Sequence, residues 1–304
     1  MVDKFRDPFV TAKNETRASV ALRDLKTLWV NTGTQCNLSC ESCYIESNPK
    51  NDRLVFFGLD DLIPYLDEIE EQNWITHEVG FTGGEPLLNP HIIALLEESL
   101  KRDFKTLLLT NAFRINRYKK DFLRLSQTYG DRFVIRVSLD HYSQEFHEKE
   151  RGQGTFAPTL SNMAWLSENN IPLAVAGRSV TGESEESARK AYGNLFAQHN
   201  ISLDPLNSSD LVLFAEMDPI RDVPEITTAC WDILQKSPDD IMCASSRMVV
   251  KRKGEERAKV LSCTLLAYDK QFELGETLVD SQKTVQLNHP FCSQFCVLGG
   301  SSCS

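Results

Sequence analysis

Short hydrophobic runs alternate with longer, periodically hydrophobic segments between residues 27 and 225. The short runs are predicted to be strands. Several are almost continuously hydrophobic, such as LLLT before Asn111 and FVIRVSL before Asp140, as is typical of strands buried on both faces of a parallel sheet. The predicted strands are Thr27–Thr32, His77–Thr82, Lys105–Thr110, Phe133–Leu139 and Leu173–Val180.

The intervening segments place hydrophobic residues at steps of three and four, which predicts amphipathic helices. Asn89-Pro90 opens one of them, because Asn caps helices and Pro suits the first turn. Alternating strands and helices with right-handed crossovers give a parallel sheet, either open or closed into a barrel. Ligands bind at the C-terminal ends of such strands. The helical stripes are Leu59, Leu62, Ile63, Leu66 and Ile69; Ile92, Ile93, Leu96 and Leu100; and Phe156, Leu160, Met163 and Leu166.

The pattern changes after residue 225. A helix is predicted at Ile226–Gln235, and Met248–Val250 with Val260–Ser262 predict a β-hairpin around a charged turn. Cysteines also concentrate here, since six of the nine lie between Cys230 and Cys303. We therefore predict a lead-in at 1–26, a core domain at 27–225 and a smaller C-terminal domain at 226–304.

Net charge and hydrophobicity narrow the range of possible functions. The 304 residues carry a net charge of −10, and such an acidic chain repels a phosphate backbone, so general nucleic-acid binding is not expected. No segment approaches the ~20 consecutive apolar residues of a membrane span, and the N-terminus lacks the apolar core of a secretion signal. We expect a cytoplasmic protein. In that reducing compartment, cysteines are more often metal ligands or catalytic groups than disulfides.

Cys36, Cys40 and Cys43 lie on one short loop directly after the first predicted strand. Three thiolates can hold three irons of a [4Fe–4S] cluster and leave the fourth iron open, whereas electron-transfer clusters use four cysteines. The spacing therefore predicts a cluster that binds an exogenous ligand. A structural zinc site is the alternative, although it requires four ligands.

The cysteine loop resembles that of the radical S-adenosylmethionine superfamily. A second resemblance is Gly83-Gly84-Glu85-Pro86, which follows the next predicted strand. Adjacent glycines let the backbone approach a ligand closely, and in the family this segment binds the methionyl amino group of the cofactor. The resemblance implies that S-adenosylmethionine binds the open iron and is cleaved to a 5′-deoxyadenosyl radical.

Further cofactor-binding positions are implied by the same resemblance. The family often has an aromatic residue before the third cysteine; Ser42 stands there, followed after Cys43 by Tyr44. For each of these positions, the structural alternative is a polar side chain at a strand end whose hydrogen bonds are made within a turn. His141 and His147 are predicted to be surface or loop histidines. The remaining family-like positions are Asn111, Ser138, Asp140, Arg151 and Arg178.

The C-terminal cysteines resemble the twitch or shortened SPASM appendix of the same superfamily, in which cysteines flanking a hairpin join others near the C-terminus around an auxiliary [4Fe–4S] cluster. Five cysteines compete for at most four places, and we favour Cys243, Cys263, Cys296 and Cys303. Cys292 is then the spare cysteine, and its replacing Cys296 is the alternative. Cys230 is expected to pack as a small apolar residue. A zinc ribbon is the structural alternative. The five candidates are Cys243, Cys263, Cys292, Cys296 and Cys303.

These features predict an α/β fold, namely a partial (β/α)6 TIM-like barrel with a small iron–sulfur appendix. The implied function is a radical S-adenosylmethionine enzyme that a flavodoxin or ferredoxin reduces. The short segment before the first strand favours a small-molecule substrate over a ribosomally made peptide or a protein side chain. A non-catalytic iron–sulfur carrier and a zinc-stabilised scaffold are the non-enzyme alternatives. The sequence identifies no catalytic acid or base.

Overall fold

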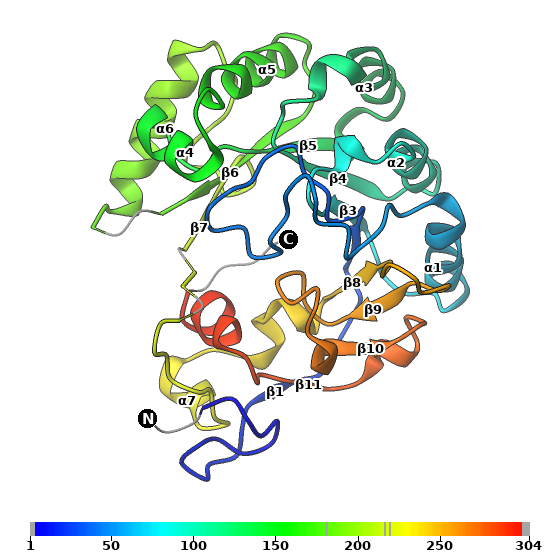
Figure 1. Ribbon diagram of the computed structural model, residues 1–304, viewed down its shortest axis with the longest axis vertical. Helices are drawn as coiled ribbons and strands as arrows, with labels where there is room; N and C mark the ends of the chain where they lie inside the picture. The colour runs from blue at the N-terminus through cyan, green and yellow to red at the C-terminus, as the bar shows by residue number, and fades with distance from the viewer. Residues whose placement is uncertain (1–3, 180–181, 216, 219, 300–304) are drawn as a thin grey trace.

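The computed structural model describes residues 4–179, 182–215, 217–218 and 220–299. Six consecutive parallel strands form the body of a nine-stranded sheet, and they curve into an open arc with helices on its outer side (Figure 1). This arrangement confirms the predicted partial barrel. The strands are β2 (Thr27–Asn31), β3 (Glu78–Thr82), β4 (Lys105–Thr110), β5 (Phe133–Ser138), β6 (Leu173–Arg178) and β7 (Leu211–Phe214).

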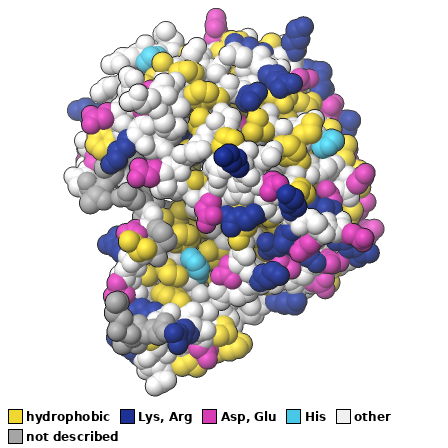
Figure 2. Space-filling model, in the orientation of Figure 1, with side chains coloured by type: hydrophobic (Ala, Val, Ile, Leu, Met, Phe, Trp, Pro, Cys, Tyr) yellow, Lys and Arg dark blue, Asp and Glu magenta, His cyan; other side chains and the backbone are white. Residues whose placement is uncertain are grey.

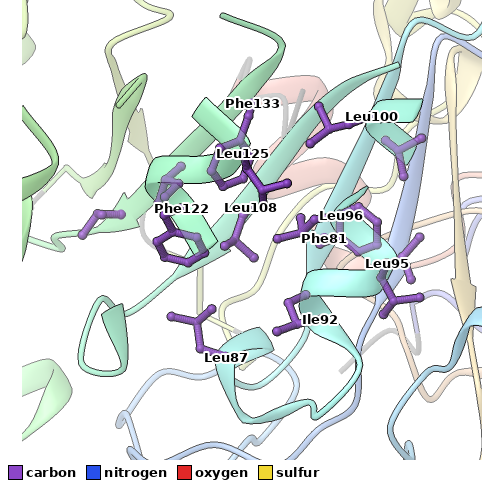
Figure 3. Packing of buried hydrophobic residues seen from close by; sticks show 14 of the residues in the cluster. Phe81, Leu87, Ile92, Leu95, Leu96, Leu100, Leu108, Phe122, Leu125 and Phe133 are labelled. Atoms are coloured by element: carbon purple, nitrogen blue, oxygen red, sulfur yellow. The ribbon is translucent and has the colours of Figure 1, made fainter. Parts of the chain in front are cut away.

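Helices connect successive strands. Hydrophobic stripes on them pack onto the outer face of the sheet, where Phe81 of β3 and Leu108 of β4 meet Leu96 and Phe122 (Figure 3). Burying such side chains contributes about 1.5–3 kcal/mol each. The helices are α1 (Leu59–Glu71), α2 (Ile92–Lys101), α3 (Ile115–Tyr129), α4 (Gln144–Arg151), α5 (Phe156–Glu168) and α6 (Glu185–Gln198).

Replacing Phe122 tests this core. Its side chain is fully buried, and its ring centroid lies 5.7 Å from that of Phe133. We expect Phe122→Ala to lower the free energy of unfolding by about 3–5 kcal/mol, because the cavity left behind cannot collapse completely. Urea denaturation measures this, with the exposed Leu206→Ala as control at no more than about 0.5 kcal/mol. Equal effects of the two variants would contradict the packing described.

The C-terminal part continues the same sheet. Strand β8 (Ser246–Val250) lies parallel to β2 at the edge opposite β7, and β9 (Lys259–Leu261) and β10 (Glu273–Gly275) follow in antiparallel order. The predicted hairpin is present as β8–β9. A separate two-stranded sheet pairs β1 (Ser19–Val20) with β11 (Val285–Gln286). Segments near both ends of the chain thus lie side by side next to β10, in the C-terminal part (Figure 1).

Short helical elements complete the structure, most of them in the C-terminal part. The helix predicted at Ile226–Gln235 is wrong in length, because only α7 (Cys230–Leu234) is helical. The amide of Ala18 donates to the Ile226 carbonyl at 2.8 Å, and Thr227 bridges Arg17, so this segment is extended. The short 3₁₀ helices are η1 (Pro86–Leu88), η2 (Gly130–Arg132), η3 (Pro238–Asp240), η4 (Met242–Ala244), η5 (Lys270–Phe272) and η6 (Asp280–Gln282), and η7 (Cys292–Leu298) is a π-helix.

Strand prediction was accurate to within one or two residues for β2–β5. For β6, the predicted end at Val180 lies outside the described residues, and the strand ends at Arg178. Strand β7 was not predicted. Among the described residues, every helix is too short or too polar to cross a bilayer.

Candidate active site

A cavity opens at the C-terminal ends of the barrel strands. It encloses about 1230 Å³, counting solvent at its mouth. Hydrophobic side chains also gather in a notch beside β7, whose C-terminal end contributes Phe214 to the cavity wall (Figure 2). The predicted site residues that line the cavity are Cys36, Cys40, Cys43, Tyr44, Gly83, Gly84, Pro86, Asn111, Ser138, Asp140, Arg151 and Arg178.

The cysteine loop is held by backbone and side-chain donors. The Sγ of Cys36 accepts from the Leu38 amide at 3.4 Å and from the Asn111 side chain at 3.8 Å, and the Sγ of Cys43 accepts from the Ser47 amide at 3.2 Å. Burial raises the pKa of Cys36 to about 12, and burial also raises the pKa of Cys40. These thiols are protonated at neutral pH, so a metal that binds them must displace protons.

Gly83 and Gly84 bring the second loop directly against the cysteine loop. A Cβ at Gly84 would lie 2.2 Å from the Gln35 carbonyl oxygen. At Gly83, φ is +139° and a Cβ would lie 2.5 Å from the Gly33 carbonyl oxygen. No larger side chain fits at either position without displacing a backbone. Loop-to-loop packing is thus a reason for these glycines in addition to ligand access.

Glu85 lies beneath the cavity and is not among the residues that line it. Its carboxylate accepts from the Thr110 hydroxyl at 2.7 Å, from the Leu87 amide at 3.0 Å and from the Asn111 amide at 2.8 Å. The side chain is 2% exposed, and burial raises its pKa. In this structure Glu85 therefore joins the glycine loop to the end of β4.

Asp140 and Arg151 form a buried ion pair on the cavity wall. The guanidinium donates to both carboxylate oxygens, at 2.7 and 3.0 Å, and Arg178 lies 3.4 Å from the same carboxylate. Burial alone would raise the pKa of Asp140, but the two guanidinium groups outweigh it and lower the pKa. Arg178 also donates to the Ser42 hydroxyl, which ties the cysteine loop to the end of β6.

The prediction of surface or loop histidines is wrong for His147, which lies in α4, and holds for His141 only in that it lies in the loop between β5 and α4. His141 is 4% exposed and His147 is fully buried. Helix α4 folds back against α5, and the His147 ring meets the Phe156 ring edge-on at 5.5 Å. Within the described residues, neither ring nitrogen of His147 has a hydrogen-bond partner, and burial lowers its pKa to about 4. His147 is therefore neutral at physiological pH. Its spacing in the sequence carries no signal of this burial.

The sequence model of the Radical SAM superfamily matches residues 30–191, which is more than half of the chain. The chain belongs to the radical SAM superfamily. Members of this superfamily are enzymes that use a [4Fe–4S] cluster and S-adenosylmethionine, so these are the cofactors of this radical SAM enzyme.

Two curated relatives each match about half of this chain. The antilisterial bacteriocin subtilosin biosynthesis protein AlbA of Bacillus subtilis is 32% identical over 143 residues, which are 47% of this chain and 30% of AlbA. The uncharacterized protein MJ0907 of Methanocaldococcus jannaschii is 26% identical over 159 residues, which are 50% of this chain and 52% of that protein. The matches thus span only about a third to a half of these relatives.

Two solved structures have a similar fold. The structure of anSMEcpe with bound AdoMet superimposes with a TM-score of 0.62 at 16% identity, over 92% of this chain and 91% of that one. Streptococcus suis SuiB bound to S-adenosylmethionine gives 0.59 at 15% identity, over 83% and 63%. These likenesses extend beyond the core into the C-terminal part of this radical SAM enzyme.

Four C-terminal cysteines line a second, smaller pocket. It encloses about 360 Å³ and contains Cys243, Cys263, Cys292 and Cys296. Cys292, which we expected to be the spare cysteine, lies with the others because η7 places it beside Cys296. Cys303 lies outside the described residues. Cys230 packs partly buried against the small C-terminal core, as expected.

Each cavity contains a buried hydroxyl that fits an iron–sulfur cluster. The Oγ of Ser47 in the first cavity and the Oγ of Ser262 in the second have no hydrogen-bond partner within the described part of the chain. Unpaired buried hydroxyls are rare, and sulfide or thiolate sulfur would accept hydrogen bonds from them. Across the described residues, no three Cys, His, Asp or Glu side chains converge as around a single ion. Cysteine thiols, which are the usual ligands of iron–sulfur clusters, line both pockets.

Gly84→Ala tests the close approach of the two loops. The added methyl group must push the cysteine loop away from its position, so we expect S-adenosylmethionine cleavage to fall on the order of 10²-fold. Overpacking should also lower the free energy of unfolding by about 1–3 kcal/mol. Gly58→Ala is the matched control, because its Cβ has ordinary room beside Asp61 at 3.8 Å. Wild-type cleavage by Gly84→Ala would contradict the packing.

Proposed function

We propose that this radical SAM enzyme is a maturase that abstracts hydrogen from a ribosomally made peptide. The observation that carries the proposal is the 32% identity to AlbA, a bacteriocin biosynthesis protein. A structure of SuiB, whose fold is similar, holds the precursor peptide SuiA. The small-molecule preference rested on the short segment before the first strand, and a recognition module outside this sequence would remove that argument.

The cavity wall supports a bulky, partly apolar substrate. Beyond the polar strand ends, Phe214, Met217, Leu265 and Phe295 line the side that faces the C-terminal part. Apolar side chains there exclude water and can hold a peptide side chain in van der Waals contact. The notch in Figure 2 lies beside β7, whose last residue, Phe214, belongs to this wall.

Within the first cavity, we assign cluster binding to Cys36, Cys40 and Cys43. When bound there, the cluster and S-adenosylmethionine supply the 5′-deoxyadenosyl radical. Arg178 is 28% exposed and can pair with a carboxylate, while Asp140 holds it and Arg151 in place. Gly83 and Gly84 present backbone to the ligand, and the remaining cofactor-binding positions on the cavity wall are Tyr44, Pro86, Asn111 and Ser138. Glu85 supports this site from behind by joining the glycine loop to the end of β4.

In the second pocket, we assign an auxiliary [4Fe–4S] cluster to Cys243, Cys263, Cys292 and Cys296. Four thiol groups in one buried pocket match the four ligands of a closed cluster. The domain boundary at residue 225 and a flavodoxin or ferredoxin reductant stay predictions.

The test is an anaerobic assay with peptides encoded beside this chain's gene. With the matching peptide, dithionite and deuterated peptide C–H positions, we expect 5′-deoxyadenosine to form faster and to carry deuterium. The modified peptide should show a mass change. A scrambled peptide is the control. Deuterium transfer only from a small metabolite, with none from any encoded peptide, would overturn the peptide assignment. It would leave the radical chemistry intact.

A further inference from the structure

A fully buried arginine stands beside the C-terminal cysteine pocket. Arg247 of β8 is 1% exposed. Its guanidinium donates to the carbonyl oxygens of Cys243 at 2.6 Å and Ser246 at 2.8 Å, and twice to that of Ser281, at 3.0 and 3.1 Å. Every one of these acceptors is a neutral backbone carbonyl. The guanidinium is therefore hydrogen-bonded, but none of these acceptors balances its positive charge.

The charge of Arg247 has no carboxylate partner. In the described part of the chain, no Asp or Glu oxygen lies within ion-pair distance of this guanidinium. The guanidinium of an arginine is not deprotonated in proteins, so this side chain is a fixed cation. An isolated buried cation is costly unless an anion balances it.

A second, independent observation points into the same pocket. Ser262 precedes Cys263 and lines the pocket, and its side chain is fully buried. Its hydroxyl has no acceptor among the described residues. A buried hydroxyl without a partner is expected to face a group that occupies the pocket when the protein carries its cofactors.

We propose that Arg247 and Ser262 raise the reduction potential of a cluster bound by Cys243, Cys263, Cys292 and Cys296. A cluster with four thiolate ligands is an anion, and reduction adds a further negative charge. A nearby fixed cation and an O–H donor to sulfur both stabilise the reduced state more than the oxidised state. This inference rests on the auxiliary cluster assigned under the proposed function.

Arg247 also joins the segment around Cys243 to that around Ser281, so a purely structural role must be separated from an electrostatic one. Arg247→Met removes the charge and keeps an apolar stem of similar length. Arg247→Lys keeps a positive charge but loses the planar fork of donors. Ser262→Ala removes only the hydroxyl. The matched control is Ser99→Ala, a buried serine whose hydroxyl bonds the Leu95 carbonyl within α2.

The experiment is an EPR-monitored redox titration of the full chain, reconstituted anaerobically, in a Cys36/Cys40/Cys43→Ala background that isolates the auxiliary signal. We expect Arg247→Met to lower the equilibrium constant for reduction of the cluster about tenfold. The reduction potential then becomes more negative by about 59 mV for a one-electron couple. Ser262→Ala should shift it in the same direction by less, and Arg247→Lys less than Arg247→Met. Ser99→Ala should leave it unchanged.

The outcomes separate this inference from the function that it rests on. If the background protein binds about four irons and all variants titrate as the parent, the inference is overturned and the auxiliary cluster stands. If the background protein binds no iron, both are overturned. If Arg247→Met fails to fold, the reduction potentials of Ser262→Ala and Arg247→Lys decide the test. Unchanged potentials in both variants would overturn the inference.

Discussion

Replacing Cys36, Cys40 and Cys43 together by Ala is expected to abolish S-adenosylmethionine cleavage, with a loss of at least about 10³-fold. The iron content should fall from about eight to about four per chain, because three-cysteine and four-cysteine sites each hold one cube. The loss is large because no other described thiol lines the first cavity. The measurements are iron and sulfide analysis and the yield of 5′-deoxyadenosine after dithionite reduction.

Cys230→Ala is the matched control for these cysteines. Its thiol lines neither described pocket, and its Sγ accepts from the Thr227 amide at 3.3 Å. We therefore expect about eight irons and wild-type cleavage. Iron that stays near eight in the triple variant would contradict the assignment of the first site. A single tetrahedral zinc in that loop would contradict it as well.

Arg151→Met is expected to have the second largest effect, because it leaves Asp140 buried without its bidentate partner. The side chains of Asp140 and Arg151 are 7% and 13% exposed, so little solvent screens them. Removing one partner of such a pair costs about 3–5 kcal/mol of unfolding free energy at pH 7. Urea denaturation measures the loss, and the half-exposed pair of Arg124 and Glu97 provides the control Arg124→Met, with at most about 1 kcal/mol expected.

The pH dependence of this loss has a definite sign. In the wild type the pKa of Asp140 is lowered, so its stabilising contribution is complete above the unfolded pKa, about 3.9, and is lost as the pH falls through the folded pKa. In Arg151→Met the folded pKa of Asp140 should be higher than in the wild type, because the strongest interaction that lowers it is lost while Arg178 stays 3.4 Å away. The stability difference between the two proteins should therefore shrink as the pH falls through these folded pKa values. A pH-independent difference would show that Asp140 does not carry the effect.

Much of the barrel could be predicted from the sequence, because its signals are local. The almost unbroken hydrophobic runs that became β4 and β5 need burial on both faces, and only a covered sheet provides that. Strand β7 was missed because its four residues, LVLF, are too few to establish a period. The helix at residues 226–235 was overestimated because Ile226 and Thr227 pair with residues 17 and 18, more than two hundred positions away.

The candidate site was likewise only partly predictable from the sequence. The spacing of Cys36, Cys40 and Cys43 and the Gly83-Gly84 pair are read from a few adjacent residues, and the structure brings them together because the C-terminal ends of parallel strands meet at one edge. The place of Cys292 in the second pocket and the burial of His147 carry no such local signal. They depend on which elements pack against them.

The sequence by itself determined the strand–helix alternation, the cysteine loop and the family, since each is written in residues close along the chain. Only the tertiary structure decided that β8 completes the sheet beside β2, that four C-terminal thiols share one pocket, and that Arg247 is buried there without a carboxylate. The physical reason is that periodicity fixes local conformation. Contacts between distant segments are instead set by burial and hydrogen bonding over the whole fold.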